Sequence, residues 1–144
     1  MLRKKAELIK NPKIPEIKGL IADMIATMKK AGGIGLAAPQ VGAPFRIFTV
    51  NIEDKVYVFI NPEVKNLSQD ESSLEEGCLS VQKIFGPVIR PKKLTIKALD
   101  ENGQLIKIRA KGLLARVIQH EMDHLNGTLF IDKAEKLYKI TEEK

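Results

Sequence analysis

The sequence predicts an α+β fold: antiparallel sheets packed around a buried, metal-binding helix, with an amphipathic helix near the N-terminus. Two segments repeat apolar residues at spacings of three and four, which is the period of a helix. Several shorter segments alternate apolar and polar residues, which is the period of a strand. The chain's two histidines lie four residues apart inside one of the helical segments. Antiparallel strands around a buried helix define the α+β class.

The composition is that of one globular domain covering residues 1–144. Hydrophobic residues make up 44% of the chain and charged residues 29%, and no repeat or linker is visible. No apolar run approaches the roughly 18 residues of a membrane span. Met1 to Lys13 lacks the apolar core of a signal peptide, and one cysteine excludes an internal disulfide. The expected location is therefore the cytoplasm, with no membrane partner.

The net charge of +6 permits an anionic partner such as RNA. The basic residues are spread along the chain, however, which favours an ordinary solvated surface. No aromatic-and-basic RNA motif is visible, and no DNA partner is expected.

The first helix is predicted over Ile14 to Lys30. Its apolar residues form one stripe, Pro15 suits a first turn, and Gly32-Gly33 supplies the stop. The glycine-rich segment from Gly32 to Gly42 lacks the Gly-Lys-Ser/Thr of a phosphate loop. Its small residues indicate close approach of the backbone to another strand or to a ligand.

Five strands are predicted after this loop, and Asp100-Glu101-Asn102-Gly103 is a strong hairpin turn between the last two. Lys65 to Ser73 is polar and is predicted to be a loop. The strands are Phe45 to Asn51, Lys55 to Glu63, Ile84 to Arg90, Lys93 to Asp100 and Gln104 to Lys111.

The second helix is predicted over Gly112 to Leu125, with Asn126-Gly127 ending it. It is apolar on most sides, so it is expected to be buried. Thr128 to Ile131 is expected to form a short strand, and Asp132 to cap a short helix that reaches about Lys139.

This second helix carries His120-Glu121-Met122-Asp123-His124, an H-E-x-x-H motif. Residues four apart share a helix face, so both imidazoles can bind one divalent ion. Such an ion lowers the pKa of a bound water toward about 7. Glu121 points about 100° away from His120 and can take the water's proton, then deliver it to a leaving amine. Cys78, the one cysteine, is either a thiolate ligand or a small buried side chain.

Three motifs, in this order, resemble those of the peptide deformylases. They are Gly33-Ile34-Gly35-Leu36-Ala37-Ala38-Pro39-Gln40, Glu76-Gly77-Cys78-Leu79-Ser80 and Gln119-His120-Glu121-Met122-Asp123-His124. The resemblance implies a metal-dependent hydrolase that removes the N-formyl group from formyl-methionyl nascent peptides and releases formate. Metal-bound water would attack the formyl carbonyl, with Glu121 as general base and acid.

The resemblance also implies a role for each matching residue. The metal ligands are Cys78, His120 and His124, and the expected ion is Fe²⁺, with Ni²⁺ or Zn²⁺ as substitutes. Gln40 and the backbone N–H of Leu79 stabilise the oxyanion. The substrate-binding residues are Ile34, Gly35, Leu74, Gly77 and Leu113.

Three of these assignments have alternatives, and so do the expected roles of two further residues, Glu76 and Asp123. Gln40 could simply be a polar residue that ends a tight loop, and Leu74 and Leu113 could be ordinary core. Glu76 is expected to pair with Arg90, unless both are surface charges. Asp123 either supports the metal ligands or is solvated.

The chain departs from the family pattern in two places. Gln82-Lys83 replaces a Pro-Gly pair after the cysteine motif, which alters the loop beside the cleft. The family's N-terminal strand is apparently missing. Residues 133–144 form a short basic tail that suits a solvated segment better than a weak ribosome contact.

Two other readings remain open: a different metalloamidase using the same motif, and a non-catalytic relative that binds peptides.

Overall fold

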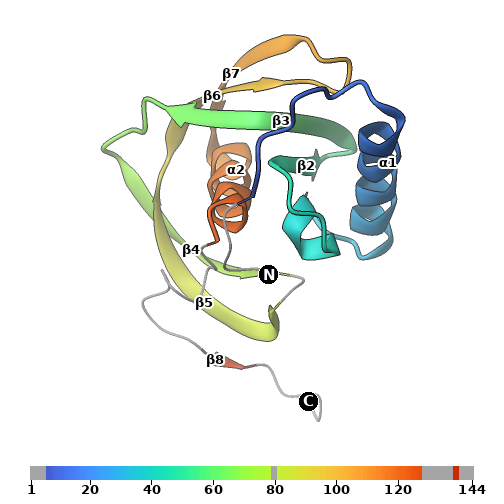
Figure 1. Cartoon of the computed structure of the whole chain (residues 1–144). Coiled ribbons are helices and arrows are strands. Elements are labelled where there is room, and N and C mark those ends of the chain that lie inside the picture. The colour runs from blue at the N-terminus through green and yellow to red at the C-terminus, as the bar shows by residue number, and fades with distance from the viewer. Residues whose placement is uncertain (1–5, 79–80, 128–137, 140–144) are drawn as a thin grey trace.

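The computed structural model describes residues 6–78, 81–127 and 138–139, with side chains described for 6–71 and 90–127 (Figure 1). Helix α1 (Pro15–Lys30) confirms the first predicted helix to within one residue. Pro15 occupies its first turn and Lys29 and Lys30 its last, where cations favour the helix dipole. Its apolar stripe of Ile17, Ile21, Met24 and Met28 is buried.

A five-stranded antiparallel sheet forms the centre of the molecule, in the order β1-β2-β3-β6-β7. The strands are β1 (Gly35–Ala37), β2 (Ile47–Ile52), β3 (Lys55–Lys65), β6 (Lys93–Leu99) and β7 (Leu105–Lys111). The 3-10 helix η1 (Ala38–Val41) follows β1. Gly103 has φ +78° in the β6–β7 turn, and the Asp100 carboxylate accepts hydrogen bonds from the N–H groups of Asn102 and Gln104. The predicted hairpin is confirmed.

The two faces of this sheet pack against different helices. One apolar cluster joins Phe48, Phe59 and Ile96 to Ile118 of α2 (Gly112–Leu125). A second cluster joins Ile47 and other residues on the opposite side of β2 and β3 to α1. The sheet therefore separates α1 from α2 and fixes both. No helix in the described ranges is long and apolar enough to cross a membrane.

The second sheet has the order β4-β5-β8 and lies across α2 from the first. It comprises β4 (Glu71–Cys78), β5 (Val81–Pro91) and β8 (Tyr138–Lys139). The predicted loop from Lys65 to Ser73 is wrong at both ends, because Lys65 belongs to β3 and Glu71 to Ser73 belong to β4. The polar residues at the start of β4 have low strand propensity, but they adopt an extended conformation because they pair along their length with β5.

The prediction of a helix that reaches about Lys139 is also wrong at the C-terminal end of that helix. Tyr138 and Lys139 form a strand that pairs with Phe85 and Ile84, and two residues are too short to show a period in the sequence. The strand expected at residues 128–131 and the start of that helix lie outside the described residues. Of the tail at 133–144, the structure describes only Tyr138 and Lys139.

Helix α2 has the predicted bounds and occupies the middle of the molecule, where it contacts β1, β2, β5 and β7 (Figure 1). The last carbonyl of α2 is satisfied from two distant segments. The Leu125 carbonyl accepts a hydrogen bond from the N–H of Ala6 at 2.7 Å and one from Arg46 Nη1 at 3.3 Å. Arg46 Nη2 also donates to Asn126 Oδ1. A guanidinium here complements the negative end of the helix dipole, so the histidine-bearing end of α2 is held firmly.

Candidate metal and catalytic site

The two histidines lie side by side near the C-terminal end of α2. Their ring centroids are 5.0 Å apart, and the rings are inclined at 71°. His124 is 1% exposed. This arrangement confirms that the four-residue spacing places both imidazoles on one face of a buried helix.

The imidazole of His124 is in a state suited to metal binding. Both ring nitrogens are buried, and neither has a hydrogen-bond partner among the described residues. Burial, and then the nearby charges of His120 and Arg90, lowers the pKa of His124 to about 3. The ring is therefore neutral at pH 7, which is the form that donates a lone pair to a metal. Buried polar nitrogens normally have partners, so these atoms fit a metal ligand better than a packed core histidine.

Cys78 is the last residue of β4, where its backbone pairs with Val81. Strand β5, which carries Val81, contacts α2. The side chain of Cys78 lies outside those described, and no group of three metal-binding side chains occurs within the described part of the chain. Its role as third ligand therefore stays a prediction.

Glu121 is 3% exposed and lies directly against Gly35 of β1. A Cβ atom placed on Gly35 would be 2.6 Å from Glu121 Oε2 and 2.8 Å from Val117 Cγ1. Any side chain at residue 35 would collide with α2. Gly35 also pairs with Val50 of β2. The close backbone approach expected of the glycine-rich segment is confirmed, and it brings β1 onto the helix that carries the motif.

Gln40 lies in η1 with its amide held in one orientation. Its Oε1 accepts a hydrogen bond from the N–H of Ala37 at 2.8 Å. Because the oxygen faces Ala37, the amide nitrogen, which carries the donors, faces the other way. Helix α2 contacts η1, so Gln40 belongs to the same region as the histidines.

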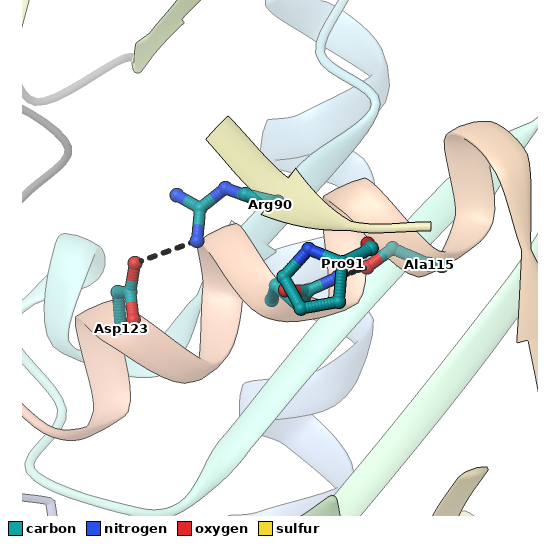
Figure 2. A network of polar contacts seen from close by, with 5 residues as sticks. Arg90, Pro91, Ala115 and Asp123 are labelled. Carbon is teal, nitrogen blue, oxygen red and sulfur yellow. Dashed lines mark hydrogen bonds and ion pairs between the residues drawn. The ribbon is translucent and has the colours of Figure 1, made fainter. Parts of the chain in front are cut away.

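An ion pair and a side-chain hydrogen bond fasten the end of β5 to α2 (Figure 2). Arg90 Nη1 donates to Asp123 Oδ2 at 3.0 Å, and the Arg90 side chain is 2% exposed. Gln119 Nε2 donates to the carbonyls of Pro91 and Ala115. Asp123 is thus buried and paired rather than solvated. The pairing expected between Glu76 and Arg90 stays a prediction, because the Glu76 side chain is outside those described.

Leu113 is exposed at the N-terminus of α2, so its alternative as ordinary core is wrong. It lies on a cavity of about 410 Å³, seven residues and roughly 10 Å along the helix from His120. The described residues lining the cavity are Pro91, Lys92, Lys93, Lys111, Gly112, Leu113 and Arg116.

The remaining predicted substrate residues are placed less completely. Ile34 is exposed immediately before β1. Leu74 and Gly77 are described only as backbone positions of β4, and Leu79 is not described.

The sequence does not indicate the contacts that Gln119 and Arg46 make. The available signals were a polar residue within an apolar helix, and an arginine immediately before a strand. Neither signal indicates which distant backbone groups the side chain reaches.

A buried helix that presents an H-E-x-x-H motif, with a fixed amide and a strand edge nearby, defines a metal-dependent hydrolase of amide bonds. Comparison with known proteins identifies the family within this class of hydrolases. A sequence profile of the polypeptide deformylase family matches residues 1–139. The chain therefore belongs to the polypeptide deformylase family.

Individual proteins that are similar to this chain are also peptide deformylases. A peptide deformylase of Dictyoglomus thermophilum is 50% identical over 145 aligned residues, covering 100% of this chain and 93% of the relative. The crystal structure of a Thermotoga maritima peptide deformylase has a TM-score of 0.90 at 38% identity, covering 94% of this chain and 91% of that one. A Synechococcus elongatus peptide deformylase in complex with actinonin has a TM-score of 0.90 at 42% identity, covering 94% and 74%.

The expected fold class and activity are confirmed. The chain is a hydrolase that removes N-formyl groups from nascent peptides in protein biosynthesis, and its family is one of metalloenzymes. Nothing in the comparisons supports the non-catalytic or altered-specificity alternative.

Proposed function

We propose that Cys78, His120 and His124 hold one divalent metal ion and that Fe²⁺ is the ion in the cell, with Ni²⁺ or Zn²⁺ as functional substitutes. The observation that carries the proposal is the buried His124 imidazole, which is neutral and has both nitrogens without a described partner. His120 lies beside it with its ring centroid 5.0 Å away. A thiolate with two imidazoles suits iron, nickel and zinc. When bound, such an ion polarises a carbonyl oxygen and acidifies a water molecule.

Glu121 is the proton carrier in this proposal. Its carboxylate is buried against the backbone of Gly35, on the helix face next to His120. A carboxylate in this position can take the proton of the attacking water and hold it at one oxygen. It then delivers the proton to the methionine nitrogen as the bond to the formyl carbon breaks, so the products are formate and a free amine.

Gln40 and the backbone N–H of Leu79 donate hydrogen bonds to the oxyanion that develops on the formyl oxygen. The support for Gln40 is its fixed orientation, because Ala37 holds the oxygen and directs the amide nitrogen away. A donor held before the reaction needs no reorganisation as charge develops.

Replacing Gln40 with Glu should lower kcat by about 10²–10³-fold, which is typical for loss of one oxyanion donor. The variant keeps an oxygen to accept the Ala37 N–H but loses the donating nitrogen. Steady-state formate release measures the effect, and thermal unfolding is the control. An unchanged kcat in a folded variant would show that Gln40 only ends the loop.

We further propose that the substrate is an N-formyl-methionyl nascent chain that lies between β1 and β4. These are the outermost described strands of their sheets, so each offers one edge for pairing. The backbones of Gly35 and Gly77 would pair with the peptide as an added strand. Ile34, Leu74 and Leu113 would contact the methionine side chain or the residues after it.

Gly35→Ala should lower kcat/KM by about 10²-fold, because an added Cβ displaces Glu121 and small misplacements of catalytic groups have effects of this size. The measurement is formate release, with metal content determined on the same sample. Gly19→Ala is the matched control, since a Cβ there meets nothing within 4 Å. Normal turnover by Gly35→Ala would contradict the placement of Glu121.

Cys78→Ser tests the metal site directly. Loss of the thiolate should weaken metal binding, measured as metal retained during titration with a chelator, and activity should fall in proportion. Equal metal affinity in the two proteins would remove Cys78 from the ligand set. The single catalytic domain over 1–144 and the cytoplasmic location complete the proposal, and the nascent peptide substrate supports that location.

A further inference from the structure

The β6–β7 hairpin brings together basic residues that are distant in the sequence. The two strands are antiparallel and directly opposed, so Lys93 faces Lys111, Thr95 faces Arg109 and Lys97 faces Lys107. Strand β3 extends the same face of the sheet, because Lys65 pairs with Thr95 and Glu63 pairs with Lys97. The basic face is defined by Lys65, Lys93, Lys97, Lys107, Arg109 and Lys111.

The β7 part of this face points to solvent, whereas on β6 Lys93 is exposed, Lys97 is half-buried and Thr95 is buried. Residues of β7 alternate strictly, with Lys107, Arg109 and Lys111 exposed while Ile106 and Ile108 pack on the apolar cluster around α2. Successive residues on one face of a strand are about 6.8 Å apart, so these three cations span roughly 14 Å.

The charge on the basic face is concentrated and strongly positive. Six cations share it with one carboxylate, Glu63, while the whole chain carries a net charge of +6. None of the six makes an ion pair with a described carboxylate. Two of the cross-strand pairs, Lys93–Lys111 and Lys97–Lys107, join like charges, an arrangement that destabilises a sheet. A binding partner with regularly spaced negative charges would relieve this repulsion.

The positive surface continues around the end of the hairpin. Lys93 and Lys111 also line the 410 Å³ cavity at the N-terminus of α2, together with Lys92. A row of anions lying on the basic face would therefore meet one further lysine, Lys92, beyond it.

We propose that the basic face binds the phosphate backbone of double-stranded RNA. The basic face has no aromatic side chain, which suits contact with phosphates rather than with bases. The hairpin tip carries Asp100 and Glu101, which a nucleic-acid groove would repel, so the hairpin cannot insert into the major groove of DNA. A-form RNA instead presents its backbone across a wide, shallow groove.

The test measures binding of a short fluorescent RNA duplex by anisotropy over a range of salt concentrations. About five phosphate contacts predict that log K falls with log salt at a slope near −4. Lys107→Glu with Arg109→Glu should reduce affinity roughly 30- to 100-fold at about 0.1 M salt and flatten the slope by about 2. Formate release from a free peptide should be unchanged, so this result is independent of the proposed function.

The matched control is Lys10→Glu with Lys18→Glu, which changes the net charge equally outside the basic face. Folding is secure in the test variant because the carboxylate introduced by Lys107→Glu would face Lys97 and form an attractive pair. A loss of RNA affinity in the Lys107→Glu, Arg109→Glu variant but not in the control variant supports the proposal. Equal loss in both variants, no binding by the unmodified protein, equal affinity for duplex DNA, or displacement of RNA by polyglutamate would each overturn it.

Discussion

Replacing Glu121 with Gln is expected to lower kcat/KM for formate release by about 10²–10⁴-fold while the bound metal stays in place. The amide has the size of the carboxylate, so the space beside Gly35 and Val117 remains filled. It cannot accept the proton of the attacking water, however. The measurement combines steady-state turnover with metal analysis of the same preparation.

Turnover and metal content together distinguish proton transfer by Glu121 from metal binding by Glu121. Low turnover with full metal content assigns Glu121 to proton transfer. Low turnover with lost metal would place the carboxylate among the ligands, and full turnover would contradict the mechanism. Glu121→Ala should be equally inactive and also less stable, because it leaves a hole in the packing between β1 and α2.

Arg90→Met is expected to lower the free energy of unfolding by about 3–5 kcal/mol, which is the usual result of removing one partner from a buried ion pair. The Arg90 and Asp123 side chains are 2% and 12% exposed, and the pair joins β5 to the helix that carries both histidines. Chemical denaturation of the metal-free protein measures the effect without a contribution from metal binding.

Asp123→Leu and the double variant complete a thermodynamic cycle. Each single change leaves one buried charge, whereas the double change removes both, so the double variant should lose less stability than the sum of the singles. Additive losses would show that the two side chains do not act as a pair.

Much of the fold was predictable because its signals are local. The bounds of α2 follow from Gly112 and from the end of the apolar pattern before Asn126. The β6–β7 hairpin follows from Asn102-Gly103, and α1 from Pro15 and its apolar stripe. The pairing of His120 with His124 needs only the geometry of a helix.

The remaining features depend on contacts between distant segments. Strand β4 has polar residues with little strand propensity and forms because β5 lies beside it. Arg90 and Asp123 are 33 residues apart, and nothing in either segment indicates that they meet. The sequence favoured a dispersed, solvated set of basic residues, yet the cross-strand register gathers six of them on one face.

Formate release from formyl-Met-Ala-Ser, by protein purified without oxygen and supplied with Fe²⁺, is the decisive measurement for a metal-dependent deformylase. We expect turnover that a chelator abolishes, that added metal restores, and that is absent with acetyl-Met-Ala-Ser. Turnover that persists at full rate after the metal has been removed would contradict the proposed chemistry, as would a failure to release formate with one equivalent of metal bound.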